Sequence, residues 1–230
     1  AMGTPLQEAG LPLGHAADTW VEHHPEEVAA VHRRAVSAGA RVLRTATLCT
    51  RPDREPQAFA RRAAAAIDLA RSASPDQVWW SVGPAGPERG PVDALDELHE
   101  LPVDAILLET FVDGSEALEA LAALHARRGS GHPVLVSLVP RPDGRLLDGG
   151  PPPVDELLAG GAAGVGFNCG SPRAVQRAVA SLPAGGPWLA APAAGPGLAD
   201  ALAALAPRVR WLGACCGVTP EALEAAWPRS

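Results

Sequence analysis

Three of the four cysteines have positions that suit metal chemistry. Cys169 follows one short apolar run of the sequence, and Cys215 and Cys216 together follow another run near its end. A single buried cysteine is most often a small apolar core residue. Here all three cysteines follow predicted strands and lie beside glycine, and four cysteines are too few for a disulfide-stapled domain of this length. This setting favours one shared metal site.

Three thiolates have a specific use in metal chemistry. They bind zinc in a tetrahedral site whose fourth position stays open for water or substrate, which is the arrangement of catalytic zinc sites. A free thiol has a pKa of about 8.5, so little of it is nucleophilic thiolate at neutral pH. A substrate thiol that binds such a site is deprotonated, and three thiolate ligands leave it weakly held. The trio therefore indicates alkylation of a substrate sulfur.

The elements that must position these cysteines alternate along the chain. Short apolar runs predict buried strands, and Ala-rich amphipathic segments between them predict helices. We expect strands at 41–47, 78–82, 105–109, 134–138, 163–168, 188–191 and 209–214. We expect helices at 25–38, 57–72, 115–128, 172–181, 198–206 and 220–227, with very short crossovers at 91–99 and 149–158.

Strict alternation of strands and helices predicts a parallel α/β fold. Seven strands and one at the extreme N-terminus would form a trimmed (β/α)8 TIM barrel with a short or incomplete first strand, and the alternative is an open doubly wound sheet. In a parallel barrel all strands end on one face, so the three cysteines would converge there. No linker divides the sequence, and residues 1–230 are expected to form a single domain.

The bulk composition limits the partners. The net charge is −7 and the basic residues form no stripe, which argues against nucleic acid as a partner. Apolar runs are interrupted before they reach membrane length, and no signal peptide pattern opens the sequence. We therefore expect a soluble cytoplasmic protein with no nucleic-acid or membrane partner.

The segment around the cysteine pair resembles a known family. Residues 212–221, LGACCGVTPE, resemble the GGCCGTTPE signature of the homocysteine S-methyltransferase family, and residues 166–169, GFNC, resemble its G-x-N-C segment. Betaine-homocysteine methyltransferase and the homocysteine domain of cobalamin-dependent methionine synthase belong to this family. Weaker matches follow in the family's order at 1–7, 32–40, 45–47, 81–84, 108–110 and 143–149. The chain is similar to a shortened member.

The resemblance implies a reaction and a cofactor. It implies a homocysteine-binding barrel that transfers a methyl group to the thiol of homocysteine, giving methionine, with Zn2+ held by Cys169, Cys215 and Cys216. The methyl donor stays open between a small molecule, S-methylmethionine or S-adenosylmethionine, and methylcobalamin on a separate corrinoid protein. Two alternatives for the function also stay open, another small thiol or selenol as acceptor and a degenerate, non-catalytic zinc-binding barrel.

The resemblance also implies substrate contacts. Glu109 would bind the amino group of homocysteine, backbone amides around Gly3 and Thr4 would bind its carboxylate, and Asn168 belongs to the same substrate-binding set. The alternative for Glu109 is an ion pair with an arginine at the barrel mouth. A carboxylate at a strand end suits an ammonium group in a partly dry site.

The sequence departs from the family at several places. The family's Asp ahead of the glycine pair has no counterpart, Ala46 stands where Asn is usual in T-N-T, and residues 192–195, PAAG, lack the Asn of P-N-A-G. An amide there would occupy the open metal position when substrate is absent, so a different resting ligand is expected. An incomplete first strand would leave a sheet edge that a second copy of the chain would cover, which makes a homo-oligomer one expectation.

Overall fold

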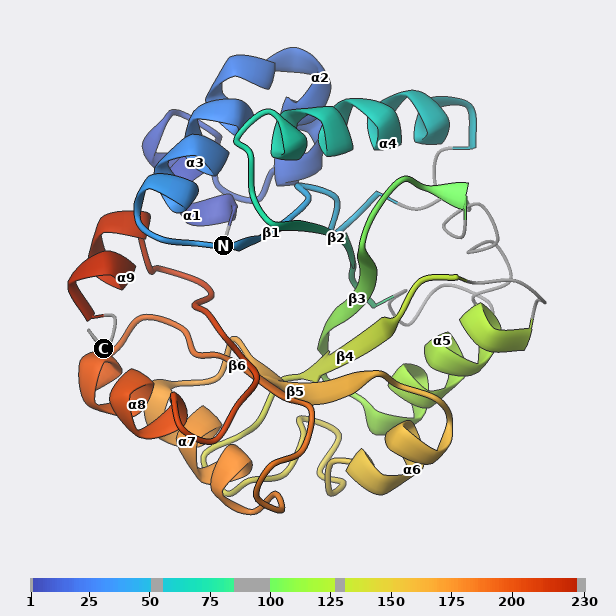
Figure 1. The fold of residues 1–230 in the computed structure, drawn as a ribbon, viewed down its shortest axis with the longest axis vertical. Coiled ribbons are helices and arrows are strands. Elements are labelled where there is room, and N and C mark those ends of the chain that lie inside the picture. The colour runs from blue at the N-terminus through green and yellow to red at the C-terminus, as the bar shows by residue number, and fades with distance from the viewer. Residues whose placement is uncertain (1, 51–55, 85–99, 127–130, 227–230) are drawn as a thin grey trace.

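The parallel α/β architecture is present in the computed structural model, which describes residues 2–50, 56–84, 100–126 and 131–226. Seven strands lie side by side in chain order, and every neighbouring pair is parallel. The sheet curls around a centre, and helices cover its outer side (Figure 1). A doubly wound sheet would reverse its strand order part-way, which this sheet does not do. The curled sheet is consistent with a trimmed barrel.

The strands overlap all seven predicted runs. They are β1 (Val42–Arg44), β2 (Gln77–Val82), β3 (Ala105–Phe111), β4 (Val134–Leu138), β5 (Gly164–Asn168), β6 (Trp188–Ala191) and β7 (Trp211–Leu212). β1 is shorter than predicted because threonine hydroxyls replace backbone groups after Arg44. Thr47 Oγ1 donates to Ser81 O at 2.9 Å, and Thr45 Oγ1 accepts from Ser81 N at 3.1 Å.

Helices connect the strands on the outer side. They are α1 (Gly3–Glu8), η1 (Ala17–Thr19), α2 (Trp20–His23), α3 (Pro25–Ser37), α4 (Pro56–Arg71), α5 (Gly114–Ala126), α6 (Val154–Ala159), α7 (Pro172–Ala180), α8 (Leu198–Leu205) and α9 (Pro220–Ala226). The six predicted helices are confirmed. α6 is short, as expected, and the predicted crossover at 91–99 lies outside the described residues.

The expectation of a strand at the extreme N-terminus is wrong for the described residues. Gly3–Glu8 form helix α1, and Leu6 on this helix is fully buried. Pro5 has no N–H to offer a strand ladder, whereas a proline in the first turn of a helix costs nothing there. The eighth strand of a complete barrel is therefore not formed by these residues.

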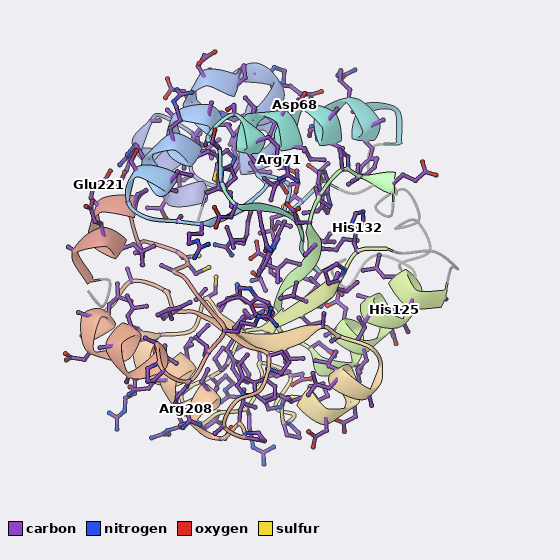
Figure 2. All side chains as sticks on the ribbon, in the orientation of Figure 1. Asp68, Arg71, His125, His132, Arg208 and Glu221 are labelled. Atoms are coloured by element: carbon purple, nitrogen blue, oxygen red, sulfur yellow. The ribbon has the colours of Figure 1, made fainter. Side chains whose placement is uncertain are left out.

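The last helix is fastened to the third by a two-point ion pair. Arg34 on α3 donates from Nε and Nη2 to the two carboxylate oxygens of Glu221 on α9, both at 2.9 Å. This contact lowers the pKa of Glu221 to about 2. Figure 2 shows Glu221 on the outside of α9, away from the centre of the sheet. The pair is exposed, so we assign it to helix docking and not to chemistry.

Alternation along the strands builds a polar layer above an apolar one. The inward-facing apolar cluster contains Trp79, Ala105, Leu107, Leu135 and Leu189, with Val42 and Trp211 packed against it. Side chains two residues apart on a strand share a face. The next inward positions toward the C-terminal strand ends are Arg44, Ser81, Glu109, Ser137 and Asn168, which we call the polar layer. The polar layer thus lies at the C-terminal end of the sheet, which we call the mouth.

None of the described helices combines the length and the apolar character needed to cross a membrane.

Candidate metal centre

The three predicted cysteines come together at the mouth. Cys169 directly follows β5, and Cys215 and Cys216 follow β7. The Sγ atoms of Cys169 and Cys216 are 3.3 Å apart, those of Cys215 and Cys216 are 3.9 Å apart, and all three lie within 4.8 Å of one another. Cys215 is buried, Cys169 is half-buried and Cys216 is exposed, so the trio opens toward the surface on one side.

The spacing of the sulfurs suits zinc. Zn–S bonds of about 2.3 Å in a tetrahedron place neighbouring sulfurs roughly 3.8 Å apart. The Cys169–Cys216 and Cys215–Cys216 sulfur separations, 3.3 and 3.9 Å, lie on either side of this value. Three thiols with one open side are also the donor set of a catalytic site with a free coordination position. The trio fits a zinc ion.

Backbone hydrogen bonds hold the cysteine loops together. The end of β6 and the loop after it contact both of them: Cys169 N donates to the carbonyl oxygen of Ala191, the last residue of β6, at 3.1 Å, and Cys215 N donates to Pro192 O at 2.8 Å. The amide of Ala194 in the same loop donates to Cys216 O at 2.8 Å. The loop that lacks the family's Asn, residues 192–195, therefore still contacts Cys215 and Cys216, and its Ala193 N donates to the carbonyl oxygen of Gly170, next to Cys169, at 2.9 Å. What it lacks is a side-chain amide.

The backbone at Cys169 is strained. Its φ is +55°, in the left-handed region that non-glycine residues rarely adopt. Thr110, at the end of β3, has a φ of +68°. Such conformations cost of the order of 1–3 kcal/mol each and persist at sites where surrounding contacts fix them. Two of the three non-glycine residues with positive φ in the described part of the chain thus lie at this mouth, as is common at functional sites.

The trio shares its protons unevenly. The pKa of Cys215 is lowered because the Cys169 and Cys216 thiols donate hydrogen bonds to its sulfur, and the positive charge of Arg44 adds to this effect. The pKa of Cys169 is raised because its hydrogen bonds with Cys215 and Cys216 favour the protonated thiol. The first thiolate therefore forms at the buried Cys215. A metal that bound the trio would displace the protons of the other two thiols.

Asn168 links the metal centre to the polar layer. Its Oδ1 accepts from Ser137 Oγ at 2.5 Å and from Thr110 N at 3.3 Å. Its Nδ2 donates to Thr110 Oγ1 at 2.8 Å and to Cys215 Sγ at 3.7 Å. The amide is buried and both of its ends are engaged within the protein, so it orients Cys215. Its predicted contact with substrate stays a prediction.

Glu109 is buried and paired with an arginine. Its Oε1 accepts from Ser81 Oγ at 2.5 Å, and its Oε2 accepts from Arg44 Nη1. Arg44 also donates from Nη2 to the carbonyl oxygen of Ala214 at 3.2 Å. The pKa of Arg44 is raised by Glu109 first and then by Cys215 and Cys169, which places its positive charge beside the metal centre. This is the ion pair that the alternative reading of Glu109 expects.

Arg44 is the site residue that the sequence did not reveal. The signal that could have identified it is the position of an arginine inside the apolar run 41–47, two residues after the inward-facing Val42. Gly3 and Thr4 do lie beside the site, since Gly217 N, next to Cys216, donates to Thr4 Oγ1 at 2.9 Å. Their contact with a substrate carboxylate stays a prediction.

The fold and the site define a parallel α/β protein with three clustered cysteines, a donor set able to hold a metal, at the C-terminal ends of its strands. A comparison with protein-family models matches residues 1–226 to the homocysteine S-methyltransferase family. The chain belongs to this family, and it is an enzyme of the homocysteine S-methyltransferase type.

Solved structures of one enzyme resemble the chain over almost its whole length. The metallated form of the homocysteine methyltransferase MmuM from Escherichia coli is 26% identical, with a TM-score of 0.84 over 100% of this chain and 94% of that one. Its apo form is 28% identical, with a TM-score of 0.79 over 98% and 92%. A putative phosphonomutase from Burkholderia cenocepacia J2315, 19% identical over 81% of this chain and 83% of that one with a TM-score of 0.54, shares the fold alone. Among curated proteins no sequence match is found.

Proposed function

We propose that this protein methylates the thiol of homocysteine to give methionine, with a zinc ion held by Cys169, Cys215 and Cys216. The observation that carries the proposal is the convergence of the three sulfurs within 4.8 Å at the mouth, in a chain of this family. The homocysteine methyltransferase from E. coli, whose match covers the whole of this chain, has been solved in a metallated form, which supports metal binding by this chain.

The residues of the mouth have separate tasks in this reaction. A bound zinc ion supplies deprotonation and positioning of the substrate thiol. The three cysteines hold it, and Asn168 keeps Cys215 oriented through its side-chain amide. The exposed side of the trio, at Cys216, gives the substrate access. No protein side chain has to act as a general base once the substrate binds as a thiolate.

The methyl transfer is an in-line displacement. The substrate sulfur attacks the methyl carbon with its lone pair, a new S–C bond forms, and the bond from that carbon to the donor breaks with its electrons leaving on the donor. Glu109 binds the ammonium group of homocysteine, and the backbone amides of Gly3 and Thr4 donate to its carboxylate. S-methylmethionine, S-adenosylmethionine and methylcobalamin on a separate corrinoid protein are the donors to compare.

Metal analysis tests the proposal. We expect about one zinc per chain in the wild type after zinc-replete purification, and a sharply reduced content in Cys216→Ser. Cys49→Ser is the matched control, because Cys49 is exposed and stands apart from the trio. Zinc-loaded protein should then form methionine from homocysteine with one of the three donors. Absence of zinc in the wild type would overturn the proposal.

A further inference from the structure

The outer member of the buried ion pair is the arginine. The Arg44 side chain is 21% exposed and that of Glu109 only 8%, so a substrate that enters the mouth reaches the guanidinium before the carboxylate. Both oxygens of Glu109 already accept a hydrogen bond, one from Ser81 and one from Arg44. A substrate ammonium that binds Glu109 must therefore share it with Arg44 or move Arg44 aside.

Arg44 has donors to spare. A guanidinium carries five N–H groups in a rigid fork. Within the described residues, the structure gives Arg44 one contact to Glu109 and one to Ala214 O. The remaining N–H groups are available to a bidentate acceptor such as a carboxylate. An arginine used only to neutralise Glu109 would not need to reach across to the segment that precedes Cys215.

The charge of the mouth explains why a cation is needed there. Glu109 and the cysteine thiolates are negative, and the mouth is only partly solvated. A carboxylate brought into this environment is repelled by like charges and loses hydration, unless a cation meets it. Arg44 is the cation of the polar layer, and its Nη2 lies 3.2 Å from the carbonyl oxygen of the residue before Cys215. It is close enough to the metal centre to contact a short thiol amino acid.

We infer that Arg44 is a specificity-determining residue that binds the carboxylate of the acceptor thiol. The zwitterion inserts into the resting pair, with its ammonium on Glu109 and its carboxylate on Arg44, so that two ion pairs replace one. Backbone amides at Gly3 and Thr4 can add hydrogen bonds to the same carboxylate, but only Arg44 supplies charge. The acceptors are then small thiols that carry a carboxylate. The inference rests on the proposed function and identifies the residue that recognises the carboxylate of its substrate.

Three thiol ligands distinguish the contribution of the substrate carboxylate to binding from that of the amino group. Homocysteine carries both groups, 3-aminopropane-1-thiol lacks the carboxylate, and 4-sulfanylbutanoate lacks the amino group. Their dissociation constants are measured by calorimetry on zinc-loaded protein without any methyl donor. The variants are Arg44→Gln and Arg44→Lys. The matched control is Arg41→Gln, because Arg41 is an exposed arginine near the start of β1 that pairs with Asp76.

The expected result is a selective loss. Arg44→Gln should lower the affinity for homocysteine and 4-sulfanylbutanoate by about 10- to 100-fold. Its affinity for 3-aminopropane-1-thiol should stay within about three-fold of the wild-type value. Arg44→Lys should restore part of the loss, since it keeps the charge but not the fork. Arg41→Gln should bind all three thiols as the wild type does. Zinc content is measured alongside, to show that the metal centre is intact in each variant.

Other outcomes overturn the inference in distinguishable ways. Equal weakening of all three thiols in Arg44→Gln with intact zinc would show that Arg44 serves only the metal centre or the fold. If Arg44→Gln does not fold, the inference is tested with Arg44→Lys and with the wild type. A wild type that binds homocysteine no more tightly than 3-aminopropane-1-thiol would then overturn the inference. A wild type that binds none of the thiols would remove the proposed function itself.

Discussion

The side-chain amide nitrogen of Asn168 lies 3.7 Å from the sulfur of Cys215. Asn168 ends β5 and Cys215 follows β7, so this contact joins two strands that are not neighbours in the sheet. The same amide is bonded to Ser137 on β4 and Thr110 on β3. One buried side chain thus fixes the orientation of the candidate metal ligand Cys215 relative to β3 and β4.

Asn168→Ala should damage stability and metal affinity together. The substitution leaves the buried Ser137 hydroxyl and the Thr110 backbone amide without their partner, which costs about 1–3 kcal/mol of the free energy of unfolding. Loss of an outer partner of a metal ligand typically lowers metal affinity by about 10- to 100-fold. Urea unfolding and zinc competition with a chelator measure the two effects. Gln176→Ala, at an exposed amide on α7, is the control and should change neither.

Most of the fold was predictable because its signals are local. Runs such as 134–138 and 188–191 match β4 and β6, since a buried parallel strand reads as a continuous apolar run. Ser171 directly before Pro172 is also a local signal for a helix start, and in the structure Ser171 Oγ accepts from Ala174 N at 3.3 Å at the N-terminus of α7. The convergence of the cysteines followed from one rule, that parallel strands end on the same face.

The pair between Arg44 and Glu109 was not predictable in the same way. A run of apolar letters shows that a strand is buried, but not which polar residues meet across a mouth built by β1, β3 and the segment after β7. The sequence offered an ion pair as an alternative for Glu109, without naming the arginine. The prediction of a strand at the N-terminus was wrong for a different reason. The eighth strand of a complete barrel was expected there, although Pro5 suits the first turn of a helix and not a strand.

Glu109→Gln should weaken the binding of amino thiols selectively. The amide cannot pair with an ammonium as a carboxylate does, so homocysteine and 3-aminopropane-1-thiol should bind about 10-fold or more weakly. 4-Sulfanylbutanoate should bind at least as tightly as to the wild type, because its carboxylate would pair with an Arg44 that has lost its partner. Calorimetry on zinc-loaded protein measures all three. Unchanged homocysteine binding would contradict the proposed role of Glu109.

Alkylation should report on the metal centre one cysteine at a time. Cys216 is exposed, so iodoacetamide should modify it readily in chelator-treated protein. Cys215 has the lowered pKa, but it is buried, so limited access of the reagent should make it react more slowly. Zinc should protect both, because a metal-bound thiolate is a poorer nucleophile toward the reagent. Cys49, exposed and apart from the trio, is an internal control whose labelling should not change with zinc. Mass spectrometry of peptides measures each site, and labelling of Cys216 at the same rate with zinc present would argue against it as a ligand.

His32 should make the fold sensitive to mild acid. It lies on α3, it is 1% exposed, and its Nε2 is buried with no hydrogen-bond partner among the described residues. Burial lowers the pKa of His32 to about 4, against an ordinary value of 6.5. Above pH 6.5 both the folded and unfolded states are neutral at this residue, and nothing is lost. Between pH 6.5 and 4 only the unfolded state takes up the proton, so the free energy of unfolding falls, by about 2 kcal/mol at pH 5 and about 3 kcal/mol at pH 4.

The variant His32→Leu isolates this contribution, because leucine fills a similar apolar space and cannot take up a proton. Urea unfolding at pH 7 and pH 5 should show a smaller loss of stability for His32→Leu than for the wild type, by about 2 kcal/mol. His125→Leu, at an exposed histidine on α5, should keep the pH dependence of the wild type. Equal losses in the wild type and His32→Leu would mean that His32 is hydrated or paired in solution. The acid sensitivity would then have to come from the carboxylates, whose ordinary pKa values place their effect mainly below pH 5.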